Sequence, residues 1–325
     1  MGVNSSYNNS VFVSFFVSFF VSVSLLMRHS SRWVIALFLL TPAMMAVNYV
    51  LGQLAFGLIA PHMLALLRWA LAGVILLAFA WPELYAKRSL LRRHAVHCLV
   101  LGTLGMWICG AWVYIGARST SANNIALLYA MSPAFIALAS TMWLPERLAA
   151  LQWLGLGLAF VGLLHVIISG QWGALANLSL NSGDAWILAA VLSWAAYSIL
   201  LKRWPSDFSP LARLVLIIFG GVVVLLPLAA VESAANLPWS QTVWSWRTAA
   251  LALVAAVIPG AGSYLAYSTL QKKLGAATAG LTLYLAPLYG AAFAWLALGE
   301  PVQWHHAVGA AVILPGIYLA SRKPG

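Results

Sequence analysis

Aromatic and amide side chains stand inside long apolar stretches of this sequence, where each could bind part of a solute. A buried Trp indole or Tyr hydroxyl needs a hydrogen-bond partner. Such rings could stack on a ring of the solute while their polar tips bind its ammonium or carboxylate group. Packing between helices, with hydrogen-bond partners inside the protein, is the competing interpretation. The candidate substrate-binding residues are Asn48, Trp107, Tyr129, Trp194, Tyr197, Tyr264, Tyr267 and Tyr284.

Two arginines interrupt the apolar stretches as well. Arg68 and Arg213 fall in the expected second and seventh membrane spans. An arginine inside a membrane is costly and marks a functional site by default, so each is a candidate contact for a substrate carboxylate. Both also lie within about two turns of a span end, where the guanidinium could instead reach the membrane interface. For Asn48, a hydrogen bond between helices competes with substrate binding.

Groups for catalysis, metal binding and cation coupling are scarce. None of the six Asp and Glu residues lies well inside an expected span, which disfavours a cation antiporter with a buried carboxylate. His165 and the pair His305 and His306 lack further ligands at metal spacing, so we expect no metal and no cofactor. A phosphate-binding loop and a catalytic cluster are also absent from the sequence. We therefore expect no enzyme, and a neutral or zwitterionic solute that flows down its gradient.

The composition assigns the chain to a membrane. Of its 325 residues, 63% are apolar and 7% are charged, whereas soluble domains carry roughly 25% charged residues. The formal net charge of +11 arises from basic residues that are too few and too scattered for a nucleic-acid partner. We expect a lipid bilayer and a small molecule as partners. A monomer is compatible with the sequence, which leaves the oligomeric state open.

Breaks at Pro, Gly and charge clusters separate ten apolar stretches, and a helix needs about 20 residues to cross a bilayer. We therefore expect an all-α membrane protein with ten transmembrane helices. An earlier apolar run, Val11–Met27, belongs to an N-terminal segment, residues 1–32, which is either an extra helix or sequence upstream of a start at Met27. The ten expected spans are Trp33–Leu54, His62–Trp81, His94–Ile115, Ser121–Trp143, Leu151–Ile168, Asp184–Arg203, Phe208–Ala230, Thr248–Leu270, Gly275–Leu298 and Gln303–Ser321.

Basic residues alternate between the loops in a way that predicts the orientation of the chain. With the residues before the first span in the cytoplasm, thirteen of the 17 Lys and Arg residues lie inside and only Arg118 and Arg247 lie outside. Cytoplasmic loops carry such an excess, so we expect both termini in the cytoplasm. The inside residues are Arg28, Arg32, Lys87, Arg88, Arg92, Arg93, Arg147, Lys202, Arg203, Lys272, Lys273, Arg322 and Lys323.

A shift of 154 residues aligns the third to fifth expected spans with the eighth to tenth without a gap. We therefore expect two five-helix repeats, residues 33–168 and 184–321. Because five is odd, the repeats must have opposite orientations, an arrangement that puts a transporter's binding site near the middle of the membrane. Coincidence among common residues is the competing interpretation. The aligned pairs include Pro133 with Pro287, Glu146 with Glu300, Gly155 with Gly309, and Gly162 with Gly316.

Prolines stand near the middle of four expected spans. Pro133 and Pro287 each remove a backbone donor, which frees the carbonyl four residues earlier, on Tyr129 and Leu283. Pro42 and Pro259 could act similarly in the first and eighth spans. Each proline either makes a kink that neighbouring helices satisfy, or bends the helix to shape a cavity and let the repeat flex.

The segments PERLAALQWLGLGLAFVG and GEPVQWHHAVGAAVILPG, each after an Ala-rich helix with a central proline, resemble the EamA repeat of the drug/metabolite transporter superfamily. The resemblance covers residues 33–321. It implies ten helices around a central cavity lined by spans 1, 3, 4, 6, 8 and 9, and export of metabolites, often amino acids, across a bacterial inner membrane by alternating access.

Aromatic residues are abundant, which makes the chain similar to the YddG-like exporters of aromatic amino acids. A nucleotide-sugar or triose-phosphate carrier is the alternative within transport, but a phosphate-bearing solute would call for several basic residues in the cavity. Outside transport, an intramembrane enzyme and a membrane scaffold are the alternatives.

Overall fold

In the computed structural model, residues 32–120, 122–145, 147–177, 181–235, 241–286, 288–289 and 304–321 are described. Throughout these ranges every regular element is a helix. The segment before Arg32, Pro287 and the chain end after Ser321 lie outside the described residues. The elements are α2 (Arg32–Ala55), α3 (Pro61–Ala86), η1 (Arg88–Leu90), α4 (Leu91–Gly102), η2 (Thr103–Ile108), α5 (Cys109–Gly116), α6 (Ala122–Ala130), α7 (Ser132–Trp143), α8 (Ala150–Ile167), η3 (Trp172–Asn177), α9 (Ser182–Arg203), α10 (Pro210–Ala234), α11 (Trp246–Ala255), η4 (Ala256–Gly262), α12 (Ser263–Leu274), α13 (Ala276–Gly280), η5 (Leu281–Leu285) and α15 (Trp304–Ser321).

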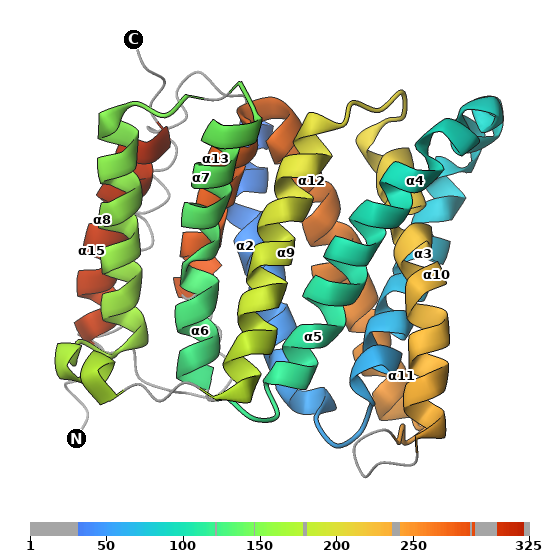
Figure 1. The fold of residues 1–325 in the computed structure, drawn as a ribbon, viewed down its shortest axis with the longest axis horizontal. Helices are drawn as coiled ribbons and strands as arrows, with labels where there is room; N and C mark the ends of the chain where they lie inside the picture. The colour runs from blue at the N-terminus through green and yellow to red at the C-terminus, as the bar shows by residue number, and fades with distance from the viewer. Residues whose placement is uncertain are drawn as a thin grey trace.

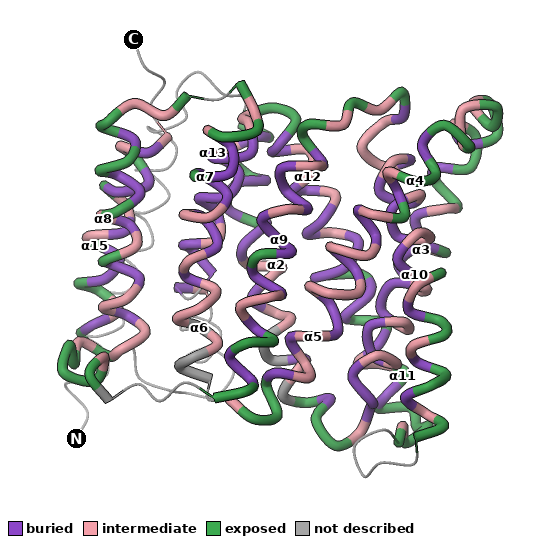
Figure 2. Tube along the Cα trace, viewed as in Figure 1, coloured by how far each residue is buried: buried purple, intermediate pink, exposed green. Residues whose placement is uncertain are grey.

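Within the described residues, six continuous helical stretches are long and apolar enough to cross a membrane. Three shorter apolar stretches, Arg32–Asn48, Leu127–Trp143 and Ala276–Leu285, accompany them. The chain is therefore an all-helical integral membrane protein. Of the six, α9 is the most buried, and buried residues run along most of its length (Figure 2). The six stretches are Pro61–Ala86, Arg88–Gly116, Ala150–Ile167, Ser182–Arg203, Pro210–Ala234 and Trp246–Leu274.

The second helix is longer than its expected span. We expected the span to end at Trp81, whereas α3 passes through Pro82 and ends at Ala86. Glu83 pairs with Lys87 one turn later, which supports the helix beyond its apolar part. The apolar pattern predicted the end of the apolar part at Trp81. The helix itself continues to Ala86 because polar side chains stabilise its last turn.

Successive long helices run in opposite directions, so the molecule has two ends (Figure 1). One end holds the starts of α4, α8 and α10 and the finishes of α3, α9 and α12. We call it the basic end because most described Lys and Arg residues lie there, whereas Arg118 and Arg247 lie at the opposite end. The cations of the basic end are Arg32, Lys87, Arg88, Arg92, Arg93, Arg147, Lys202, Arg203, Lys272 and Lys273.

Two of the long helices contain a π-helical turn in the middle. η2 joins α4 to α5, and η4 joins α11 to α12. The 154-residue shift places residues 103–108 on residues 257–262, so the two turns coincide in the repeat alignment. A π-helical turn disturbs the regular hydrogen-bond ladder and occurs frequently at functional sites. Both turns lie within otherwise regular spans and leave carbonyl groups for other partners.

The helices α3 and α10 lie against each other, and each caps the start of the other (Figure 1). Glu83 near the end of α3 accepts hydrogen bonds from the backbone N–H and the hydroxyl of Ser209, the residue before α10. At the other end, Glu232 of α10 accepts from the backbone N–H of His62 at the start of α3. A carboxylate at a helix N-terminus satisfies free amides and complements the helix dipole. The two caps therefore join both ends of the pair.

The helices α8 and α15 pack side by side at one edge of the molecule (Figure 1). Gly155 contacts the backbone of Gly316, and Gly162 contacts that of Gly309. A methyl group added at Gly155 would lie 2.4 Å from the backbone nitrogen of Ala320. Small residues let membrane helices approach this closely. In the 154-residue alignment each glycine contacts the equivalent of the other, as expected for a two-fold relationship.

The fourth expected span is interrupted near its proline. α6 ends at Ala130, Met131 forms a turn, and α7 begins at Ser132 with Pro133 as its second residue. Proline is tolerated in the first turn of a helix, where its missing donor has no partner to lose. Pro42 instead lies inside the continuous helix α2, and Pro259 lies in the π-helical turn η4.

Candidate substrate site

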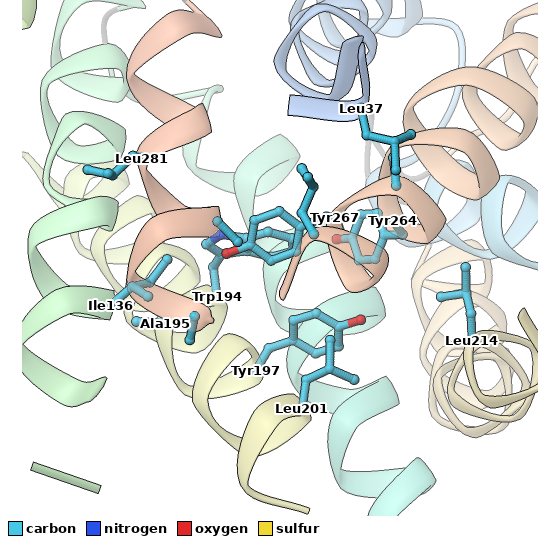
Figure 3. Close-up of a cluster of buried hydrophobic side chains, with 14 of the residues drawn as sticks. Leu37, Ile136, Trp194, Ala195, Tyr197, Leu201, Leu214, Tyr264, Tyr267 and Leu281 are labelled. Carbon is cyan, nitrogen blue, oxygen red and sulfur yellow. The ribbon is translucent and has the colours of Figure 1, made fainter. Parts of the chain in front are cut away.

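Four of the aromatic candidates meet in the middle of the molecule (Figure 3). Trp194 and Tyr197 come from α9, and Tyr264 and Tyr267 come from α12. The Trp194 ring centre lies 5.3 Å from those of Tyr197 and Tyr264 and 4.9 Å from that of Tyr267. Trp69 of α3 joins them, 4.7 Å from Tyr264. All five side chains are buried, and we call them the aromatic cluster.

Polar side-chain groups of the cluster donate hydrogen bonds to backbone carbonyls of η2, the first π-helical turn. The Tyr264 hydroxyl donates to the carbonyl of Gly105, and the Trp69 indole donates to that of Met106. Ser193 of α9 donates to the neighbouring carbonyl of Leu104. Side chains from three helices, α3, α9 and α12, therefore donate hydrogen bonds to the backbone carbonyls of η2. The Trp194 indole nitrogen is buried and has no hydrogen-bond partner, so this donor is available to a solute.

Arg68 lies beside the aromatic cluster and is only 5% exposed, so its guanidinium does not reach the interface. Its Nη1 donates to Oδ1 of Asn48 at 2.9 Å, and its Nη2 donates to the carbonyl of Pro259 in η4 at 2.7 Å. The guanidinium also lies 4.5 Å from the Trp69 ring centre, within cation–π range. The Tyr114 hydroxyl donates to the same Asn48 oxygen. We call Asn48, Arg68 and Tyr114 the arginine centre.

The charge of Arg68 is unbalanced within the described part of the chain. Glu83 pairs with Lys87, and Asp207 and Glu232 contact the rings of His94 and His62, so none of these three carboxylates contacts Arg68. The Arg68 Nε is buried and has no partner. A buried cation held only by neutral oxygens favours an anion, because guanidinium groups bind carboxylates through several donors at once.

The other sequence candidates are not members of these two groups, although some border them. Trp107 is half-buried, and its ring contacts Trp112 rather than the aromatic cluster. Tyr284 is fully buried, and its hydroxyl has no partner. Tyr129 is half-buried and contacts a small apolar group around Ile187. Arg213 donates to the carbonyls of Leu201 and Trp204 at the end of α9.

Sequence reasoning missed three members of the site, Trp69, Tyr114 and Ser193. Trp69 follows Arg68 directly, and Tyr114 lies two residues before the end of α5; neither was singled out from the sequence. The adjacency of Arg68 and Trp69 was the available signal. Ser193 carried none, because a hydroxyl inside a helix usually bonds within its own helix.

The His, Cys, Asp and Glu side chains of the described residues do not gather into a metal site. No group of three His, Cys, Asp or Glu side chains there could hold a metal ion. His165 contacts Trp304, and His305 contacts His306. The three ion pairs lie at helix ends. Outside the spans, the hydrogen bond with the His94 ring lowers the pKa of the Asp207 carboxyl, so this loop residue stays charged.

Comparison with known proteins now decides the family. The model of the EamA-like transporter family matches residues 32–168 and 181–322. The chain belongs to this family. As an EamA-like transporter, it moves a solute across a membrane and is not an enzyme. The two matches divide the chain close to the loop between α8 and α9.

Relatives of this EamA-like transporter include the uncharacterized transporter YyaM of Bacillus subtilis, which is 28% identical over 84% of this chain and 88% of its own length. An uncharacterized transporter of Archaeoglobus fulgidus is 24% identical over 88% and 96%. A probable terminal-alkyne amino-acid exporter of Streptantibioticus cattleyicolor is 26% identical over 80% and 84%. A crystal structure with a TM-score of 0.68 covers 87% of this chain and 95% of its own, at 18% identity, and so supports the fold alone.

Proposed function

We propose that this EamA-like transporter exports small zwitterionic metabolites, most of all amino acids with an aromatic side chain, by alternating access. The observation that carries the proposal is the adjacency of the arginine centre and the aromatic cluster. The Arg68 guanidinium lies 6.0 Å from the Tyr264 ring centre. A solute with a carboxylate next to a ring would contact both groups at once. One relative is named an amino-acid exporter, which supports the same substrate class.

The carboxylate binds Arg68 in this proposal. Two of the five guanidinium donors are used, and the Nε is free. Asn48 and Tyr114 orient the guanidinium, and the unpartnered Trp194 indole offers a second donor. A nucleotide sugar or a sugar phosphate carries more negative charge than one buried arginine neutralises, so a phosphate-bearing substrate fits this centre less well.

The solute ring takes a place among the rings of the aromatic cluster. In the structure these rings fill the middle of the molecule and contact one another, so the substrate must part them. Replacing ring–ring contacts by ring–substrate contacts keeps the same chemistry and costs little. Tyr129 borders the cluster, because Cys109 contacts both Tyr129 and Tyr264, and Trp107 and Tyr284 are not members of the cluster.

Two inverted five-helix repeats, residues 33–168 and 184–321, would provide the alternation. Three features support this symmetry: the coincident π-helical turns, the reciprocal caps of α3 and α10, and the paired glycines of α8 and α15. Inverted repeats rock against each other around a central site. The π-helical turns and the interruption before Pro133 are the flexible points that we assign to this motion, with Pro287 as the equivalent of Pro133.

The basic end faces the cytoplasm in this proposal, because cytoplasmic loops carry the excess of Lys and Arg. Both termini then lie in the cytoplasm of a bacterial cell, and the protein lies in the inner membrane. Substrate enters at the basic end and leaves at the end that carries Arg118 and Arg247. Export needs no cofactor.

A substitution at Asn48 tests the carboxylate site without removing the buried arginine. Asn48→Asp has the same shape and keeps the contacts with Arg68 and Tyr114, but it supplies an internal carboxylate to the guanidinium. We expect phenylalanine efflux from proteoliposomes to fall at least tenfold, because the internal carboxylate competes with that of the substrate. The free energy of unfolding should stay the same or rise.

Arg68→Lys is the companion variant, since an ammonium keeps the charge but lacks the guanidinium fork. We expect it to retain partial transport, with a raised KM for phenylalanine. Normal phenylalanine flux in a folded Asn48→Asp variant would contradict the carboxylate site. If the reconstituted wild-type protein transports other small solutes but no amino acid, the proposed substrate class is wrong.

A further inference from the structure

A pocket of about 260 Å³ opens at the basic end, between α9, α10 and α12. Lys202, Arg213 and Lys272 line it, and none of the described lining residues is Asp or Glu. Phe208 is among its apolar walls. The volume of the pocket is slightly below the roughly 300–1,000 Å³ typical of ligand sites. It therefore suits a small solute with a negative group, and is too small for a nucleotide.

Backbone carbonyls keep these cations at the pocket. Arg213 donates to the carbonyls of Leu201 and Trp204, which end α9. Lys202 donates to the carbonyl of Gln271 near the end of α12. Carbonyls at helix C-termini carry only partial negative charge, so they orient the cations without neutralising them. The cationic character of the pocket therefore remains.

The one acidic residue in the adjoining loop is held elsewhere. Oδ2 of Asp207 lies 2.9 Å from the His94 ring of α4, and its backbone carbonyl accepts from Lys87. Both contacts orient Asp207 toward α3 and α4, whereas the pocket lies among α9, α10 and α12.

The floor of the pocket is part of the aromatic cluster. Tyr197 lines the pocket, and its ring centre lies 5.3 Å from that of Trp194 and 5.9 Å from that of Tyr264. Tyr264 in turn contacts Trp69 and Arg68. The rings of Tyr197 and Tyr264, which Figure 3 shows, therefore connect the pocket to Arg68 of the arginine centre.

We propose that this basic pocket is an entry site that binds the carboxylate of the solute before the aromatic rings part to admit it. Lys202, Arg213 and Lys272 attract the carboxylate, and Tyr197 separates the entry site from the arginine centre. The solute then passes from the cations of the pocket to Arg68 in the arginine centre. The identity of the solute rests on the proposed function, whereas the preference of the pocket for a carboxylate does not.

The charge of the pocket can be measured without transport. Ser206 lines the pocket, and Ser206→Cys in a background with Cys98→Ala and Cys109→Ala gives a single thiol. Its labelling rates with an anionic and a cationic methanethiosulfonate are compared, each divided by its rate with a free thiol. We expect the anionic reagent to react about fivefold faster.

Neighbouring cations provide the matched control. Lys202→Gln with Lys272→Gln should bring the ratio close to one. Arg203→Gln with Lys273→Gln removes the same charge from adjacent positions that do not line the pocket, and should change the ratio by less than a factor of two. Equal effects of the two pairs would mean that the thiol senses only the general charge of the basic end, which would overturn the proposal.

Occupancy by a carboxylate is the second measurement. Phenylacetate, which has a ring and a carboxylate, should slow labelling of the Ser206→Cys thiol at least threefold at millimolar concentration. Phenethylamine, the cation of similar size, should not. Protection by both, or by neither, would overturn the proposal. Because neither measurement needs flux, a failure of amino-acid export in proteoliposomes would count against the proposed function and leave this result standing.

Discussion

Glu232 of α10 binds His62 of α3 twice. One carboxylate oxygen accepts the backbone N–H of His62 at 2.8 Å, and the other lies 3.0 Å from Nδ1 of its ring. The Glu232 side chain is almost fully buried, although it lies close to the end of its helix. Pro61 and Pro210, like Glu83 and Glu232, are 149 residues apart, so the same pattern of a proline start and a glutamate cap occurs in both helices.

This relationship predicts unequal effects of removing the two caps. Glu232→Ala leaves the amide of His62 buried without its acceptor, which costs about 1–3 kcal/mol of unfolding free energy. Glu83 is more exposed, and water can replace it, so Glu83→Ala should cost less. Chemical unfolding in detergent measures both. Equal losses would mean that the burial of Glu232 does not determine the strength of its cap.

The contact between α8 and α15 gives a second stability prediction. Gly155→Ala places a methyl group 2.4 Å from the backbone nitrogen of Ala320, so the helices must separate. We expect a loss of about 1–3 kcal/mol, typical of overpacking. Gly157→Ala is the matched control on the same helix, because nothing lies within 4 Å of its added methyl group. If Gly157→Ala is also destabilising, the loss of stability comes from an alanine in α8 and not from its contact with α15.

The aromatic cluster predicts a change in selectivity. Trp194→Ala removes a ring that contacts Tyr197, Tyr264 and Tyr267. Losing one stacking partner worth about 0.5–1.5 kcal/mol lowers affinity roughly two- to tenfold. The efflux ratio of phenylalanine to threonine should fall accordingly. Trp186→Ala, on the same helix but in contact with Trp112, should keep the wild-type ratio. An unchanged ratio in well-expressed Trp194→Ala would remove this ring from recognition.

The proposed orientation predicts which loops an impermeant maleimide can reach in intact cells. Ser89 is exposed at the basic end, so Ser89→Cys should stay unlabelled. Gly173 lies in η3 at the opposite end with open space around it, so Gly173→Cys should label rapidly. Both use the background without Cys98 and Cys109. The reverse pattern would invert the topology and assign the basic pocket to the outside.

The apolar stretches of the sequence were sufficient to predict most helices. Their ends agree with the structure to within a few residues for the stretch from α4 to α5, for α8 and for α9, because membrane helices require long apolar runs. The N-terminal segment before Arg32, Pro287 and residues 290–303 lie outside the described residues. Predictions for Pro287 and Glu300 therefore remain untested.

The sequence alone determined that this chain is an apolar helical membrane protein with a 154-residue internal similarity, since composition and periodicity depend only on residue type and order. It also predicted Arg68 and the rings of α9 and α12 as candidates. Only the tertiary structure decided which candidates meet. Arg68 bonds to Asn48 and Pro259, twenty and 191 residues away, whereas Trp107 contacts Trp112, because contacts between helices depend on their rotation and depth. A regular apolar pattern does not specify either quantity when both faces of a helix are apolar.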